Sequence, residues 1–141
     1  VAFLNMAAPL AEKAGVTIVA EPLNKGECNI INTVGEAMEY VREVSHPGFK
    51  CLVDSYHFWL EEEPLGNLEA AMADIHHVHV ADKVGRVAPG ESGQSDYGPF
   101  FAVLKAGGYD GLCSIEGKVA WDDPEALSRY CNYLHEAWDE A

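Results

Sequence analysis

The chain has 141 residues, of which 48% are hydrophobic and 23% charged, a composition typical of one globular domain with a buried core. Nine lysines and arginines stand against 23 aspartates and glutamates, so the net charge of −14 argues against nucleic acid or an anionic membrane as a partner. No apolar run reaches the roughly 18 residues of a transmembrane helix. No signal peptide is visible, and we expect a single cytoplasmic domain over residues 1–141.

The first predicted elements are a helix and a buried strand. Residues 2–14 are expected to form the helix, which is either kinked at Pro9 or begins near it. Gly15 suits the C-terminal end of this helix. The apolar run 16–20 predicts a buried strand, and residues 22–32 form a loop that is long for a strand–helix connection.

A second helix and strand follow this loop. Thr33 predicts a helix N-cap, and Glu36 three residues later completes a capping box. The helix is expected to end at His46-Pro47-Gly48, where proline and glycine interrupt the pattern. Residues 50–53 then form a second buried strand.

The rest of the chain continues this alternation of helices and strands, which predicts a parallel sheet with helices on its faces. Four such units are about half of a (β/α)₈ barrel. Residues 61–63, three glutamates in a row, are expected to be a solvated surface. The remaining predicted elements are a loop rich in aromatic and acidic residues after residue 54, a helix over 68–73, a strand over 76–80, a loop over 82–96, a helix over 97–106, a strand over 112–115 and a helix over 124–138.

The four cysteines show no metal-binding or disulfide spacing. Cys28, Cys51, Cys113 and Cys131 contain no CxxC pair, and free thiols are the expectation for a cytosolic protein. Cys51 and Cys113 lie inside predicted strands, and we expect both to be small core residues.

A residue that can bind a metal lies at the end of each predicted strand. Glu21, Asp54 and Glu116 directly follow their strands, and His79 lies near the end of the third. The carboxyl ends of adjacent parallel strands lie side by side at the same end of a sheet, about 4.8 Å apart. Three carboxylates and an imidazole at such a point predict a site for one divalent metal, and the oxygen-rich set favours Mn²⁺, Mg²⁺ or Co²⁺ over structural zinc.

The motifs around these residues appear in a characteristic order over residues 15–117. They are Glu21-Pro22-Leu23-Asn24 with Glu27 beyond it, Asp54-Ser55-Tyr56-His57, the run His77-Val78-His79-Val80-Ala81-Asp82 with Arg86 and Pro89-Gly90 after it, and Gly108-Tyr109-Asp110-Gly111 before Ser114-Ile115-Glu116. In this order and spacing the chain resembles the xylose-isomerase-like TIM-barrel superfamily, and within it most of all the ketose 3-epimerases of the tagatose and psicose type.

The resemblance implies that the chain is the C-terminal half of a barrel, equivalent to strands five to eight. A half-barrel leaves two sheet edges and an apolar inner face open. The expected partners are therefore a small sugar and either a second copy of the chain or a missing N-terminal half.

The resemblance also implies a mechanism and the residues that carry it. Glu21, Asp54, His79 and Glu116 would bind one Mn²⁺, Mg²⁺ or Co²⁺, and Glu21 and Glu116 would exchange a proton at C3 of a ketose from opposite faces, through an enediolate. Three further residues would contact the sugar: Glu27, His57 and Arg86. For each of these the alternative is a structural role, as a solvated loop carboxylate, a histidine hydrogen-bonded to backbone, and a surface arginine.

Other functions remain open from the sequence. Hydroxypyruvate isomerases and inosose dehydratases of the same superfamily share similar acids at the strand ends. An inactive half-barrel that serves as an assembly or binding module is another possibility. A repair endonuclease of the same fold is disfavoured, because the loop after His79 lacks the DxH of a three-zinc cluster and the charge is −14.

Overall fold

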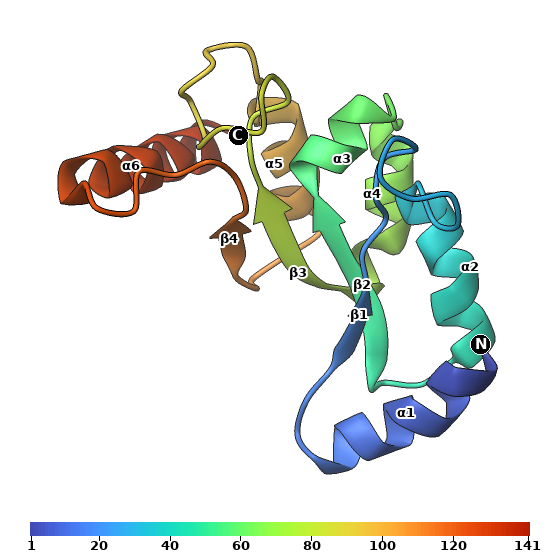
Figure 1. The fold of residues 1–141 in the computed structure, drawn as a ribbon. Helices are drawn as coiled ribbons and strands as arrows, with labels where there is room; N and C mark the ends of the chain where they lie inside the picture. Colours follow the sequence, from blue (N-terminus) through green and yellow to red (C-terminus); the bar gives the residue numbers. More distant parts are fainter.

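A computed structural model describes residues 1–141 and contains one four-stranded parallel sheet with helices around it (Figure 1). The strands β1 (Ile18–Ala20), β2 (Phe49–Asp54), β3 (Ile75–Val80) and β4 (Cys113–Ile115) are adjacent in chain order, and every neighbouring pair is parallel. Because parallel neighbours need a crossover, a helical segment lies between each strand and the next. The predicted α/β class with a parallel sheet is confirmed.

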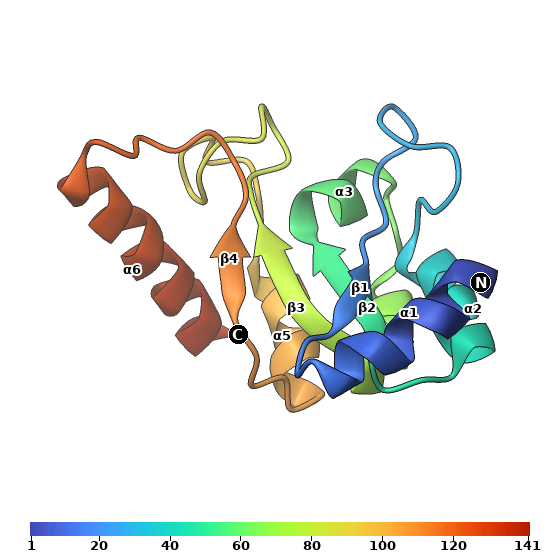
Figure 2. The same ribbon diagram turned by 60° about the horizontal axis from the view of Figure 1, so that its bottom comes forward.

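Four helices form a row beside the sheet: α2 (Val34–Val44), α4 (Leu65–Ala71), α5 (Gly98–Ala106) and α6 (Pro124–Glu140). Helix α2 packs on α4, α4 on α5 and α5 on α6. Helix α6 lies on the β4 side of the sheet and α2 on the opposite side (Figure 2). No helix is both long and apolar enough to cross a membrane. The other helical segments are α1 (Ala2–Lys13), α3 (Ser55–Leu60) and a 3₁₀ turn over Met72–Asp74.

The core lies between the sheet and this row of helices. On β3, Val78 and Val80 are fully buried and belong to the core, whereas His77 and His79 on the other face keep partial exposure. This alternation follows from the two-residue period of a strand. The imidazole side chains of His77 and His79 therefore lie outside the apolar core.

Two local predictions for helix ends agree with the structure. The Thr33 hydroxyl accepts from the Glu36 backbone N–H, and the Glu36 carboxylate accepts from the Thr33 backbone N–H, which completes the capping box. Gly15 follows α1 with a φ of 70°, a conformation that glycine adopts without strain. Pro9 lies inside α1, which begins at Ala2 and not at the proline.

The segment after Asp54 was predicted as a loop, and this was wrong. It forms α3, because the Asp54 carboxylate accepts from the Tyr56 backbone N–H at 2.8 Å and caps the helix. Phe58 of α3 is buried, with its ring 5.6 Å from that of Phe100. Helix α4 begins at Leu65, three residues before the predicted start, and β1 is limited to three residues.

Two burial predictions also need correction. Glu63 is buried, since its carboxylate accepts from the backbone N–H groups of Val34 (3.0 Å) and Gly35 (3.2 Å) at the start of α2. A carboxylate is favourable there, because the first N–H groups of a helix lack partners within the helix. Cys51 is buried as expected, but Cys113 is exposed, because its side chain lines an open cavity between β4, α5 and α6.

Candidate metal centre

The four side chains predicted to bind a metal lie together at the carboxyl ends of the strands. Glu21, Asp54, His79 and Glu116 each offer one ligand atom, and these atoms all lie within 4.8 Å of one another. The strand register explains this, because Asp54 pairs with His79 across β2 and β3. The structure therefore brings the four predicted residues to one place, and their role as metal ligands stays a prediction.

His79 lies between the two glutamates that come from the outer strands. Its Nδ1 is 3.3 Å from Glu21 Oε1 and 3.5 Å from Glu116 Oε2. Asp54 is the most buried of the three carboxylates, with only 2% of its surface exposed. The cluster is thus closed on the Asp54 side and open on the Glu116 side, where the residue is exposed.

Burial raises the pKa of two of these carboxyl groups. Burial raises the pKa of Asp54 to about 6, although the Tyr56 N–H and the Arg86 guanidinium oppose the shift. Burial also raises the pKa of Glu21, and the neighbouring Glu116 carboxylate adds to this effect. Burial makes the ionised forms of these two carboxyl groups less favourable, and a bound cation would offset this free-energy cost.

The size and chemistry of the cluster fit one divalent cation. Ligand oxygens on opposite sides of an ion with bonds of about 2.1 Å lie about 4.2 Å apart, and the ligand atoms of this cluster all lie within 4.8 Å of one another. No thiol takes part, and three carboxylates with one imidazole suit Mg²⁺, Mn²⁺ or Co²⁺. The donor set therefore fits the metal that the sequence predicts.

Arg86 is the cation that the structure places among these carboxylates. Its Nη2 is 3.2 Å from Asp54 Oδ2 and also pairs with Glu116, and its Nη1 is 3.6 Å from Glu27 Oε2. The guanidinium lies over the ring of Tyr56, 4.8 Å from the centroid. The structure thus brings Arg86 and Glu27 to the cluster, as predicted for residues that contact a substrate.

The backbone around Arg86 is fixed by contacts that the sequence did not reveal. Arg86 has a φ of 50°, and its carbonyl accepts from the Lys118 N–H at 2.8 Å. A Cβ on Gly117 would lie 3.0 Å from that carbonyl oxygen, so glycine permits the close approach. The loop that carries Arg86 closes around the buried Asp82 carboxylate, which accepts from the backbone N–H groups of Gly90 and Ser92 and from the hydroxyls of Ser92 and Tyr97.

His57 is the third predicted substrate contact, and it lies beside Asp54. Only 1% of its surface is exposed, and its Nδ1 accepts from the Asn24 backbone N–H at 3.2 Å. Its Nε2 has no hydrogen-bond partner and lies 3.8 Å from Asp54 Oδ2. Burial lowers the pKa of His57, and the Arg86 guanidinium lowers it further, which favours the neutral ring.

Asn24 is a residue of the site that sequence reasoning missed. Its amide Nδ2 lies 2.8 Å from Glu27 Oε1 and 2.9 Å from His57 Nδ1, so it contacts two of the three predicted substrate-binding side chains. Its place in the motif that begins with Glu21 was the only sign of this in the sequence.

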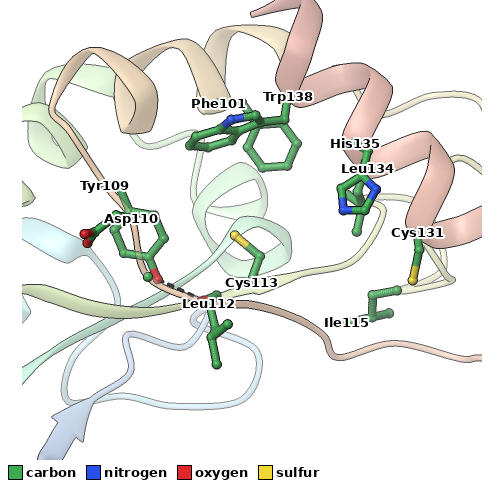
Figure 3. Close-up of a pocket in the computed structure, with 11 residues that line it drawn as sticks. Phe101, Tyr109, Asp110, Leu112, Cys113, Ile115, Cys131, Leu134, His135 and Trp138 are labelled. Carbon is green, nitrogen blue, oxygen red and sulfur yellow. Dashed lines mark hydrogen bonds between the residues drawn. The ribbon is translucent and has the colours of Figure 1, made fainter.

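A mainly apolar cavity lies elsewhere in the structure. It has a volume of about 480 Å³ and lies between β4, α5 and α6, with the rings of Phe101 and Trp138 on one side (Figure 3). Its lining is mainly apolar, and none of the four candidate ligands lines it. The candidate site is therefore the cluster of acids and not this cavity.

Comparisons with known proteins identify the family of the chain. Residues 1–136 match the sequence model of the family described as xylose isomerase-like TIM barrel. The chain is 34% identical over 130 residues to 3-dehydro-D-guloside 4-epimerase of Escherichia coli (strain K12), with 89% of this chain and 48% of that protein covered. It is 31% identical over 139 residues to ketose 3-epimerase of Arthrobacter globiformis, with 97% and 47% covered.

Solved structures show the same relationship. The crystal structure of D-allulose 3-epimerase from Methylomonas sp. superposes with a TM-score of 0.86 at 25% identity, over 96% of this chain and 54% of that one. The chain spans about half the length of the curated relatives that it matches. The predicted half-barrel fold is thus confirmed, and its position as the C-terminal half stays a prediction. With this fold and a family match over nearly its whole length, the chain belongs to the xylose isomerase-like TIM barrel family.

Proposed function

We propose that the chain is part of a metal-dependent sugar epimerase or isomerase, with a ketose 3-epimerase as the specific activity. One observation carries the proposal: four ligand-type side chains from four parallel strands converge within 4.8 Å at the end of the sheet where barrel enzymes hold their active sites. The relatives named as sugar epimerases support the reaction class.

Glu21, Asp54, His79 and Glu116 would hold the cation, and the chemistry of this donor set favours Mn²⁺, Mg²⁺ or Co²⁺. When bound, such a cation polarises a carbonyl oxygen and makes the neighbouring C–H bond more acidic. The other parts of the proposed reaction depend on the side chains of the chain itself.

Glu21 and Glu116 are the proposed acid and base for proton exchange at C3. They follow β1 and β4, the two outer strands of the sheet, so they approach the centre of the cluster from two sides. One group, as the ionised carboxylate, removes the C3 proton to give an enediolate, and the other, as the protonated carboxyl group, delivers its proton to the opposite face of C3. Burial raises the pKa of Glu21, and the neighbouring Glu116 carboxylate raises it further, which favours the protonated form of Glu21.

Arg86, His57 and Glu27 are the proposed substrate contacts. Arg86 offers a planar set of donors for sugar oxygens. His57 presents a ring nitrogen without a partner, and Glu27 is a part-exposed acceptor that suits a hydroxyl group. Together they would orient a small sugar so that C3 lies between the two glutamates.

We also propose that the chain functions with its sheet edges covered. The outer sides of β1 and β4 pair with no strand, and three apolar side chains of α1, Phe3, Met6 and Leu10, are each about two-thirds exposed. Unpaired edges and exposed apolar groups favour association. A second copy or a complementary half of the barrel would cover them.

Calorimetric titration with Mn²⁺ tests the metal centre. We expect one site per chain in the wild type and in Glu43→Gln, an exposed control on α2, and loss of the site in Glu116→Gln. A screen of ketoses, with hydroxypyruvate included, then tests the reaction by deuterium incorporation from solvent at C3. Retained binding in Glu116→Gln, or Mn²⁺-dependent turnover without deuterium incorporation, would overturn the assignment.

A further inference from the structure

Asn24 lies between two side chains of the proposed substrate site. It is in the loop after β1, only 7% exposed, and its amide contacts both Glu27 and His57. A buried amide with several partners is oriented by them, and its orientation determines what its neighbours must donate or accept.

The orientation of the Asn24 amide follows from two partners that have a single possible role each. Its Oδ1 accepts from the Gly26 backbone N–H at 2.9 Å, and a backbone N–H can only donate. Its Nδ2 lies 2.8 Å from Glu27 Oε1, and an ionised carboxylate can only accept. The group that faces His57 is therefore the NH₂ donor.

This orientation determines the protonation of the His57 ring. The Asn24 Nδ2 lies 2.9 Å from His57 Nδ1, and the Asn24 backbone N–H points to the same nitrogen at 3.2 Å. Two donors face Nδ1, so Nδ1 must be the acceptor of the neutral ring. The proton of the neutral ring then lies on Nε2.

The Nε2–H group has no acceptor within the chain. It is buried, has no hydrogen-bond partner, and its closest carboxylate oxygen, on Asp54, is 3.8 Å away, beyond hydrogen-bond range. A buried donor without a partner is costly, and in a site it marks the position of an acceptor supplied by a ligand.

We infer that Asn24 is a positioning residue, which holds His57 in the Nε2–H tautomer so that this group donates to a hydroxyl or carbonyl oxygen of the bound sugar. The identity of the acceptor rests on the proposed function, whereas the tautomer does not. The same amide holds Glu27, so one side chain sets two of the three proposed substrate contacts.

Nitrogen NMR of the chain labelled with ¹⁵N-histidine tests the tautomer directly, at a pH above the ordinary histidine pKa. Loss of signals in His57→Gln identifies the ring of interest. We expect the Nε2–H form in the wild type. We also expect it in the control Asn32→Ala, which removes another buried amide of the same loop that bonds to the Leu23 and Cys28 carbonyls.

Two variants of Asn24 separate its donors. Asn24→Asp places a carboxylate beside Nδ1, and we expect the proton to move to Nδ1. Asn24→Leu removes the amide but keeps the backbone N–H, and we expect a mixture of the two tautomers. An Nδ1–H or mixed form in the wild type, or an unchanged Nε2–H form in both variants, would overturn the inference.

A kinetic comparison tests the contact with substrate. With a ketose that the wild type epimerises, we expect kcat/KM to fall about tenfold in Asn24→Leu and to stay near the wild-type value in Asn32→Ala. Equal values for Asn24→Leu and the wild type would overturn the donor role. If no sugar is turned over by the wild type, the proposed function fails, while the NMR result still decides the tautomer.

Discussion

Asp54 is held in the fold at an energetic cost, and Asp54→Asn should therefore stabilise the chain. The carboxyl group is buried, and burial raises its pKa from 3.8 to about 6. The folded state thus binds this proton more tightly than the unfolded state does. Its stability should fall as the pH rises from about 4 to about 6 and remain low above that range.

The size of the effect follows from the shift. About two pKa units at about 1.4 kcal/mol each give roughly 3 kcal/mol at pH 7. Asparagine still accepts from the Tyr56 N–H and still caps α3, and the net pKa shift already includes the attraction between Asp54 and the Arg86 guanidinium, which opposes the effect of burial. We expect Asp54→Asn to raise the free energy of unfolding by about 3 kcal/mol at pH 7.

Urea unfolding followed by tryptophan fluorescence, with a chelator present, measures this difference. The gain should disappear near pH 4, where the wild-type carboxyl group is protonated. Asp139→Asn on the exposed face of α6 is the control and should change little at either pH. If Asp54→Asn is less stable than the wild type at pH 7, or if its gain is the same at both pH values, the burial argument is refuted.

Three further predictions test the fold and the site. Glu63→Gln should lower the free energy of unfolding by about 1–2 kcal/mol because it weakens the bonds at the start of α2, while the exposed Glu62→Gln should change it little; equal effects would contradict this. Excess Mn²⁺ should raise the urea midpoint of the wild type and leave Glu21→Gln unchanged, and a rise in both would place the ion elsewhere. Sedimentation should show species larger than a monomer, because β1 and β4 have open edges and apolar side chains of α1 are exposed; a single monomer at every concentration with a cooperative melt would contradict it.

The sequence was sufficient wherever short-range chemistry decides the structure. The alternation of helical segments and strands along the chain marked all four strands, and the Thr33 and Glu36 pair marked the start of α2. The four candidate ligands could be predicted for the same reason: each is tied to the end of a strand, and parallel strands end at one edge.

The errors lie where a side chain depends on a distant segment. Helix α3 exists because Asp54 caps it and Phe58 packs against Phe100, which is 42 positions later in the chain. Glu63 reads as one of three solvated glutamates, yet the start of α2, about 28 residues earlier, supplies its partners. Neither contact can be predicted from the pattern of neighbouring residues in the sequence.

What the sequence alone determined is the parallel α/β class, the family resemblance and the four residues at the strand ends, because strand period and strand polarity are local properties of the chain. Only the tertiary structure decided the burial, the charged neighbours and the hydrogen bonds of the side chains in the candidate site. It buried Asp54, set Arg86 among the carboxylates and turned the Asn24 amide towards His57. Burial, charge pairing and the direction of a hydrogen bond depend on distances between segments far apart in the chain, and the fold is what fixes those distances.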